Sequence, residues 1–261
     1  MDKRNAVLIT GAAVNTGYSI AGKFATNGYK TVIITSRNKN KLDSALEKLS
    51  LEHPETDFLG YVLSGVDEEN TIDENAVKAV FEDLDKKQIF IKSLVLNAAH
   101  LGVDIKIFEN PLSDFISVIN ANLILNYCLC EHAAKRMKDC GGGSIVFINS
   151  NTAYRAIPDR IAYSASKGGQ LGMMRAMALD LGKYNIRVNA VLPGMIKTDR
   201  WDADYEKYSS LPSAFTPLGD VATGADIADA VWYFSENARN TTGAELTVDG
   251  GNTIQLYPII K

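Results

Sequence analysis

The chain has 261 residues, enough for one large domain or two small ones. Its 27 lysine and arginine residues against 31 aspartate and glutamate residues give a net charge of −4, so we expect no nucleic-acid partner. A hydrophobic fraction of 46% with 22% charged residues excludes the disordered and fibrous classes. No apolar run approaches the roughly 18 to 20 residues of a membrane span, and the N-terminus lacks the pattern of a signal peptide. Three cysteines, an odd number, predict reduced thiols in a cytoplasmic protein without a metal site.

Short apolar segments alternate with longer helical ones along the whole chain. Strands are predicted at 6–10, 31–35, 58–63, 93–96, 144–148, 187–191 and 245–248. Helices are predicted at 18–27, 42–49, 76–84, 114–137, 161–181 and 225–235. This repeated alternation predicts an α/β fold, a Rossmann-type doubly wound parallel sheet of about seven strands with helices on both faces. No linker or repeat interrupts it, so residues 1–261 are predicted to form one domain.

A glycine-containing loop, residues 10–17, joins the first predicted strand to the first predicted helix. Its glycines, Gly11 and Gly17, let the backbone approach a pyrophosphate, and the helix N-terminus offers unpaired N–H groups to an anion. The loop therefore predicts a dinucleotide-binding site.

The end of the second predicted strand indicates which dinucleotide binds. Ser36 stands where an acidic residue would bind the ribose 2′-hydroxyl of NAD, and Arg37 follows it. Arg37 can pair bidentately with a 2′-phosphate, and no acid is present to repel one. We therefore expect NADP(H) rather than NAD(H), the alternative being a solvated arginine.

Tyr163 and Lys167 lie four residues apart at the start of a predicted helix, so both side chains share one face. An ammonium about 5 Å from the phenol favours the phenolate by about 3 kcal/mol, which predicts a tyrosine pKa of about 8. The same spacing recurs at Tyr257 and Lys261, but only Tyr163 has a serine, Ser150, at the end of a strand thirteen residues before it. The alternative for Ser150 is a cap of a turn or helix.

With these motifs the chain resembles the short-chain dehydrogenase/reductase family, in its classical-type branch, from about residue 7 to residue 252. The resemblance is carried by the ordered set Thr10-Gly11, Gly17, Asn97-Ala98-Ala99, Asn122, Ser150, Tyr163, Lys167, Pro193-Gly194 and Val248-Asp249-Gly250-Gly251.

The resemblance implies a role for each matching residue. Tyr163 would be the general acid or base, Ser150 would stabilise the substrate oxygen, and Lys167 would hold the nicotinamide ribose and lower the tyrosine pKa. Asn122 would position a water that relays protons to Lys167, or else be a buried asparagine that bonds backbone. The implied cofactor contacts are Gly11, Asn15, Thr16, Gly17, Ser36, Arg37, Asn97, Ala98, Tyr163, Lys167, Pro193, Gly194, Ile196 and Thr198.

The chain departs from the family pattern at several positions. Asn15 replaces the second loop glycine, and asparagine tolerates the left-handed backbone that such a turn requires. Leu96 and Ala99 replace an asparagine and a glycine of the family motif. His100 is expected to be a surface residue rather than a substrate contact. The segment 64–73 is longer than the family pattern, so the adenine contact is placed only in the region of Leu63 and Ser64.

The resemblance favours an oxidoreductase that transfers a hydride between NADP(H) and a ketone or secondary alcohol, with 3-oxoacyl-carrier-protein reductases and hydroxysteroid dehydrogenases as leading examples. Two alternatives are an enoyl-type reductase, suggested by Ser19-Ile20-Ala21, and a catalytically silent NADP-sensing protein. Enoyl-type members usually space the tyrosine and the lysine by six residues, so the four-residue spacing here disfavours the first alternative. A pure sensor requires no catalytic serine, tyrosine or lysine, so the intact site disfavours the second. The substrate, a small molecule, is expected under the loop 197–216. The assembly is expected to be a homotetramer or homodimer that packs its long helices between subunits, and the tail, 254–261, is apolar enough to reach a neighbour.

Overall fold

A computed structural model, which describes residues 4–64, 66, 71–199 and 214–258, shows a sheet of seven parallel strands. The sheet order is β3-β2-β1-β4-β5-β6-β7. The strands are β1 (Arg4–Ile9), β2 (Thr31–Ser36), β3 (Asp57–Val62), β4 (Ile89–Leu96), β5 (Gly143–Ile148), β6 (Ile186–Pro193) and β7 (Glu245–Val248). The predicted doubly wound parallel sheet is thereby confirmed.

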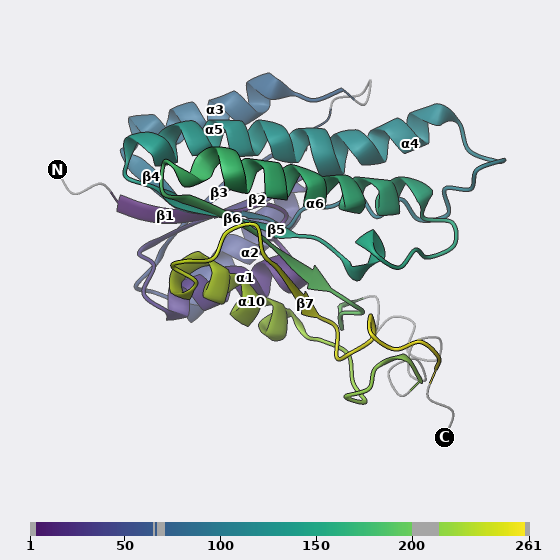
Figure 1. Ribbon diagram of the computed structural model, residues 1–261. Coiled ribbons are helices and arrows are strands. Elements are labelled where there is room, and N and C mark those ends of the chain that lie inside the picture. The colour runs from purple at the N-terminus through teal and green to yellow at the C-terminus, as the bar shows by residue number, and fades with distance from the viewer. Residues whose placement is uncertain (1–3, 65, 67–70, 200–213, 259–261) are drawn as a thin grey trace.

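Helices cover both faces of the sheet (Figure 1). One face carries α3 (Glu74–Lys86), α5 (Leu125–Asp139) and α6 (Ile161–Gly182), with α4 (Leu112–Ile119) leading into α5. The other carries α1 (Asn15–Thr26), α2 (Lys39–Glu52) and α10 (Gly224–Trp232). Alternate residues of β1 enter the two cores: Ala6 and Leu8 pack under the first layer, Val7 and Ile9 under the second.

Several helices begin earlier than their apolar periodicity predicts, because polar caps start them. Asn38 precedes α2 and accepts a hydrogen bond from the Lys41 N–H at 2.9 Å. Asp73 caps α3 in the same way, through the Ala76 N–H at 2.9 Å. The first turns of these helices are polar, so hydrophobic spacing alone places their starts too late.

Two predicted helices are each interrupted by a π turn, which corrects the single helices expected at 114–137 and 225–235. The π turns are η1 (Asn120–Ile124), between α4 and α5, and η3 (Tyr233–Asn237), after α10. A π turn widens the hydrogen-bond ladder and leaves main-chain carbonyls for outside donors. At η3 the Arg187 guanidinium donates to the carbonyl of Phe234, and to that of Ser235 at 2.6 Å. Such turns depend on a distant donor, so local periodicity does not predict them.

One continuous stretch, Leu112–Asp139, is apolar and long enough to cross a membrane by length and composition, although we expected no such run. Within the fold it comprises α4, η1 and α5 and packs against β4 and α6. Its buried residues, among them Leu125 and Leu129, belong to the core on that face of the sheet. Only 33% of its most apolar window is buried inside the fold, so packing in the core accounts for part of its apolar composition.

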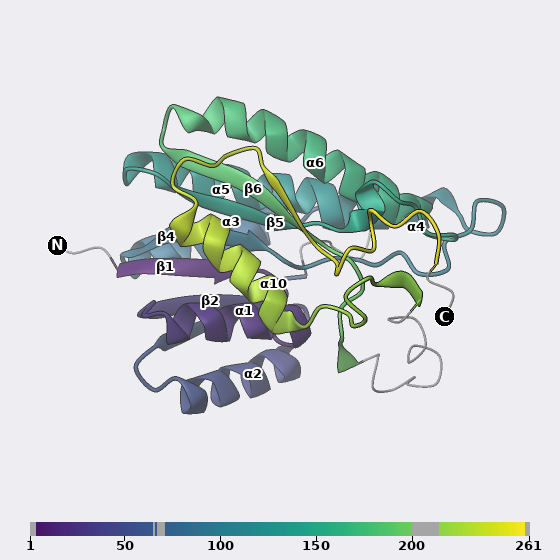
Figure 2. The same ribbon diagram turned by 60° about the horizontal axis from the view of Figure 1, so that its bottom comes forward.

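The strands run parallel, so the loops that follow them gather at one edge of the sheet (Figure 2). The order of strands reverses between β1 and β4, which places the glycine loop beside the residues that follow β4. A short 3-10 turn, η2 (Asn151–Ala153), follows β5 at the same edge. Most of the predicted substrate loop, including Trp201, Tyr205, Tyr208 and Leu211, and much of the 64–73 segment lie outside the described residues.

Candidate active site

The glycine loop takes the conformation expected of it. Gly11 has φ +63°, and a Cβ built there would lie 2.9 Å from the Ala98 Cα. Asn15 has φ 51°, so asparagine does occupy the left-handed region where the family pattern has glycine. The Asn15 Oδ1 accepts the Asp199 N–H at 3.1 Å, which joins the loop to the segment after β6.

The N-terminus of α1 is suited to an anion. Its N-cap, Val14, provides no side-chain hydrogen bond, and its first turn holds no acidic residue. Thr16 and Gly17 are buried there, so their backbone stands close against the loop. Uncapped first-turn N–H groups and the helix dipole attract a phosphate. The donor set therefore fits the pyrophosphate of a dinucleotide.

Asn97 holds the ends of β1 and β4 together. Its Nδ2 donates to the carbonyls of Thr10 and Gly11, both at 3.0 Å. The backbone N–H groups of Asn97 and Ala98 both donate to the Thr10 hydroxyl at 3.0 Å. Asn97 thus fixes the glycine loop at the point where the strand order reverses.

Ser36 and Arg37 lie at the end of β2. The Ser36 hydroxyl accepts the Asn38 N–H at 3.2 Å. Arg37 is exposed and forms no salt bridge with another residue that the structure describes. Burial, and secondarily the charge of Arg37, lower the pKa of His100, so the guanidinium lies within electrostatic range of that ring.

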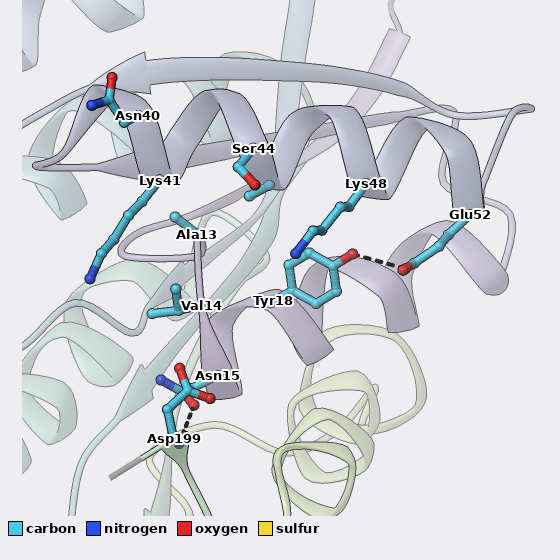
Figure 3. Close-up of a pocket in the computed structure, with 11 residues that line it drawn as sticks. Ala13, Val14, Asn15, Tyr18, Asn40, Lys41, Ser44, Lys48, Glu52 and Asp199 are labelled. Atoms are coloured by element: carbon cyan, nitrogen blue, oxygen red, sulfur yellow. Dashed lines mark hydrogen bonds between the residues drawn. The ribbon is translucent and has the colours of Figure 1, made fainter. Parts of the chain in front are cut away.

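A cavity of about 510 Å³ opens between α1 and α2 beside this edge. Figure 3 shows Lys41 reaching from α2 toward the glycine loop near Val14, while the Tyr18 hydroxyl donates to Glu52 at 2.9 Å farther along. Lys41 is a cation that our sequence analysis missed, because one lysine in a polar first turn gives no signal. Neither Tyr163 nor Lys167 lines this cavity.

Ser150, Tyr163 and Lys167 come together beyond the C-terminal end of β5. The Ser150 hydroxyl lies close enough to the Tyr163 phenol to lower its pKa, and it accepts the Thr152 N–H at 3.2 Å, so the expected turn cap is present too. The Lys167 Nζ lies 5.5 Å from the centre of the Tyr163 ring and donates to the Ile148 carbonyl at 2.8 Å. By contrast, the second tyrosine with this spacing, Tyr257, is 76% exposed.

The predicted fall of the Tyr163 pKa to about 8 is wrong in this structure. Burial raises the pKa of Tyr163, while the Ser150 hydrogen bond and the charge of Arg160 lower it less strongly. Burial also lowers the pKa of Lys167 to about 7. Our calculation included the attraction between the two groups but omitted the cost of removing each from water.

Asn122 does not leave its side chain free to position a water. It lies within η1, where its Oδ1 accepts the His100 N–H at 2.6 Å and its Nδ2 donates to the His100 carbonyl at 2.9 Å and the Ser166 hydroxyl at 3.0 Å. The alternative, a buried asparagine that bonds backbone, is what the structure shows. His100 itself is half-buried, so it is partly exposed as a surface residue would be, and its Nδ1 accepts the Gly102 N–H at 3.1 Å.

The segment after β6 closes the edge on the other side of β5. Gly194 donates its N–H to the Val248 carbonyl at 3.1 Å, and a Cβ built at Gly194 would lie 2.6 Å from the Asp249 Cβ. Ile196, which bridges to Ala222, and Thr198 are both half-buried. Pro193 ends β6, so the predicted residues 193, 194, 196 and 198 form one continuous wall of this edge.

Two buried amides next to Lys167 were missed entirely. Gln170 is 1% exposed and contacts the Lys167 ammonium, and Asn149 is 3% exposed and contacts Gln170. The available signal was the spacing of Tyr163, Lys167 and Gln170, which places all three on one face of a helix.

Within the described residues, no group of three histidine, cysteine, aspartate or glutamate side chains is placed to hold a metal ion. The site is therefore built from a serine, a tyrosine, a lysine and amides at the C-terminal edge of a parallel sheet, beside a loop suited to a dinucleotide. These features define a nucleotide-dependent enzyme of the Rossmann class.

Comparison with known proteins identifies the family. A family model described as enoyl-(acyl carrier protein) reductase matches residues 11–253. A 3α-hydroxysteroid dehydrogenase of Mediterraneibacter gnavus is 31% identical over 96% of this chain and 97% of its own length. A 3-oxoacyl-(acyl-carrier-protein) reductase of Mycobacterium tuberculosis is 32% identical over 94% of this chain and 91% of its own length. The chain is an oxidoreductase that belongs to the short-chain dehydrogenase/reductase family.

Solved structures agree with this assignment. ElxO with NADP bound superposes with a TM-score of 0.85 at 28% identity and covers 97% of this chain and 100% of its own. A 7α-hydroxysteroid dehydrogenase complexed with NADH and 7-oxo glycochenodeoxycholic acid gives a TM-score of 0.84 at 29% identity, and covers 97% of this chain and 95% of its own.

Proposed function

We propose that this protein transfers a hydride between NADP(H) and a ketone or secondary alcohol, with Tyr163 as the general acid or base. The observation that carries the proposal is the grouping of Ser150, Tyr163 and Lys167 at one end of β5, with the Ser150 hydroxyl close enough to the Tyr163 phenol to lower its pKa. A hydroxyl and a phenol that meet at one point can both donate to a single carbonyl oxygen.

The nicotinamide nucleotide, when bound, supplies or accepts the hydride. Gly11, Asn15, Thr16, Gly17, Asn97, Ala98, Pro193, Gly194, Ile196 and Thr198 are the residues that would hold it, together with Ser36 and Arg37. In reduction Tyr163 gives its phenolic proton to the substrate oxygen, and Ser150 donates a hydrogen bond to the same oxygen as negative charge develops there. Burial raises the pKa of Tyr163, which keeps the phenol protonated and ready to donate at neutral pH.

In the direction of alcohol oxidation Tyr163 must accept a proton, and a raised pKa leaves little phenolate at neutral pH. A protonated Lys167 favours the phenolate, and at a pKa of about 7 this lysine is only partly charged near neutrality. Reduction is therefore the direction that these pKa directions favour.

The preference for NADP(H) is supported by cations at the end of β2. Arg37 is exposed and forms no salt bridge among the described residues, and Lys41 reaches toward the same edge from α2. Both can approach a 2′-phosphate, and no acidic residue stands at position 36 to repel it. Because one similar structure contains NADP and another contains NADH, the preference is inferred from the cations of this chain, Arg37 and Lys41.

A second candidate is reduction of an activated carbon–carbon double bond, which the description of the matching family model favours. The four-residue spacing of Tyr163 and Lys167 and the serine beside the tyrosine support a carbonyl substrate instead. A catalytically silent nucleotide sensor is the third possibility, although sensing requires neither Ser150 nor Tyr163.

The test is consumption of NADPH with a panel of aliphatic, aryl, steroid, sugar and 3-oxoacyl ketones. We expect turnover of at least one ketone class by the wild type and a loss of at least about a hundredfold in Tyr163→Phe. The phenylalanine variant keeps the ring and removes only the hydroxyl, and its binding of NADPH serves as the control for folding. Turnover that survives Tyr163→Phe would refute the mechanism, and a wild type that binds NADPH but reduces no ketone would favour the sensor.

We also propose a homotetramer or homodimer. A groove of about 300 Å³ lies between α5 and α6, lined in part by Tyr127, Met177 and Leu181. Leu179, on α6, is 84% exposed. Apolar side chains on adjacent helices are suited to a subunit contact. Sedimentation of the purified protein is expected to show an assembly, and a monomer at micromolar concentration would contradict the proposal.

A further inference from the structure

Gln170 lies at the centre of a buried hydrogen-bond network behind the proposed catalytic residues. It is on α6, less than one turn after Lys167, and only 1% of its surface is exposed. Its Oε1 accepts from the Lys167 Nζ at 3.3 Å and from the Asn149 Nδ2 at 3.0 Å. Its Nε2 donates to the Asn122 carbonyl at 2.6 Å. One amide thus links α6 to β5 and η1.

The orientation of this amide is fixed by its neighbours. A backbone carbonyl can only accept and an ammonium can only donate, so Nε2 must face Asn122 and Oε1 must face Lys167. Asn149 is fixed in turn, because its Oδ1 accepts the Ser150 N–H at 2.8 Å and its Nδ2 donates to the Lys167 carbonyl at 2.9 Å. Rotating either amide by half a turn would lose these bonds.

The π turn at η1 presents the acceptor that this amide requires. Asn122 is fully buried and its side chain is already bonded to His100 and Ser166, so its main-chain carbonyl is the group that remains for Gln170. A buried carbonyl and a buried ammonium each need a partner, and the glutamine supplies one to both.

We propose that Gln170 is a positioning residue, whose amide joins the Lys167 ammonium to the Asn122 carbonyl and holds that ammonium in place beside Tyr163. The inference rests on the proposed function, because Lys167 is placed there in the catalytic machinery. Gln170 does not touch the Tyr163 hydroxyl or the Ser150 hydroxyl, so it acts through Lys167.

The surroundings of the ammonium determine what the loss of this amide would do. Tyr163 is the titratable group beside the Lys167 ammonium on the same helix. The charge of Arg160, just before α6, lowers the pKa of Tyr163. β5 and η1 face the network with uncharged groups, the Ile148 carbonyl and the amide and carbonyl of Asn122. Burial lowers the pKa of Lys167 to about 7, so each remaining acceptor helps to keep it charged.

The direct test is the pKa of Lys167 in cofactor-free protein, followed by NMR of lysine labelled with carbon-13 at Cε. The Lys167 signal is assigned by its absence in Lys167→Met. In Gln170→Met, which keeps the length of the side chain but removes the acceptor, we expect the pKa of Lys167 to fall by about one pH unit. In Gln170→Glu, which keeps an acceptor oxygen, it should stay at or above the wild-type value. Met174→Leu, a buried change one turn farther along α6, is the matched control and should leave it unchanged.

The second readout is the pH profile of kcat/KM for NADPH-dependent ketone reduction. A fall of one pH unit from a pKa near 7 leaves about a tenth of the lysine charged at pH 7 instead of half. In reduction the charged ammonium stabilises the phenolate that forms as Tyr163 gives up its proton, so kcat should fall about fivefold with KM little changed. The profile should move toward acid in Gln170→Met and not in Gln170→Glu.

A folded Gln170→Met protein that titrates Lys167 like the wild type overturns the inference. If Gln170→Met does not fold, Gln170→Glu decides, because a fall of the Lys167 pKa in that variant also overturns it. The NMR titration needs no substrate, so an enzyme that reduces no ketone would refute the proposed function and leave this test standing.

Discussion

Replacing Lys167 with methionine removes a charge that the fold buries at a cost. The side chain is 1% exposed, and burial lowers the pKa of Lys167 from 10.5 to about 7. Methionine has a similar length and no charge, so it fits the same space. At neutral pH and below, the wild-type lysine is partly or fully charged in the core. We therefore expect Lys167→Met to be more stable than the wild type, despite the two hydrogen bonds that the variant loses.

The pH dependence follows from the direction of the shift. Between the folded pKa of about 7 and the unfolded value of 10.5, the unfolded lysine binds a proton that the folded one does not, so wild-type stability rises with pH. The slope is about 1.4 kcal/mol per pH unit, which amounts to about 3 kcal/mol between about pH 7.5 and about pH 9.5. Below the folded pKa both states are protonated and this contribution is constant.

The assay is urea denaturation followed by circular dichroism, at several pH values and one protein concentration for both proteins. Other titrating groups cancel in the difference between Lys167→Met and the wild type. The advantage of the variant should shrink by about 3 kcal/mol as pH rises from about 7.5 to about 9.5. A difference that stays constant over this range would mean that Lys167 titrates normally in the folded protein, which would refute the burial argument.

Three further changes test the cofactor site and the backbone. Arg37→Ala should weaken NADPH binding about tenfold while leaving NADH binding unchanged, because one charge-assisted contact to a 2′-phosphate is lost. Fluorescence titration measures both affinities. A wild type that binds NADH more tightly than NADPH would contradict the role given to Arg37. Gly17→Ala should abolish the thermal stabilisation by NADPH, because a Cβ there would lie 2.6 Å from the Ala12 Cα. Gly172→Ala, its matched control on α6, has no heavy atom within 4 Å of the added Cβ and should instead raise stability by about 0.5 to 1 kcal/mol, so destabilisation there would contradict this account of the helix surface.

The parts of the site that follow local patterns could be predicted from the sequence. The apolar strands predict a parallel sheet, and a parallel sheet brings the residues after its strands to one edge, which is why Ser150, Tyr163 and the glycine loop lie at the same edge. The spacing of Tyr163 and Lys167 predicts one helix face, and both lie on α6 with the ammonium 5.5 Å from the ring centre.

The parts that depend on distant partners could not be predicted. Spacing places Gln170 on the helix face of Tyr163 and Lys167, but it does not reveal the partner of its amide, the Asn122 carbonyl of η1. The π turn that contains Asn122 leaves the hydrophobic periodicity of its helix almost unchanged. Charge spacing predicts an attraction between Tyr163 and Lys167, but burial, which spacing does not reveal, dominates the pKa of both groups.

The central claim, hydride transfer to a carbonyl carbon with Tyr163 as the proton donor, is tested most directly by following the hydride itself. The substrate is an α,β-unsaturated ketone, and the reductant is NADPH that carries deuterium at the transferred position of its nicotinamide. We predict an allylic alcohol with deuterium on the carbinol carbon, formed by the wild type and not by Tyr163→Phe. A saturated ketone with deuterium on the β-carbon would contradict the account and establish double-bond reduction instead.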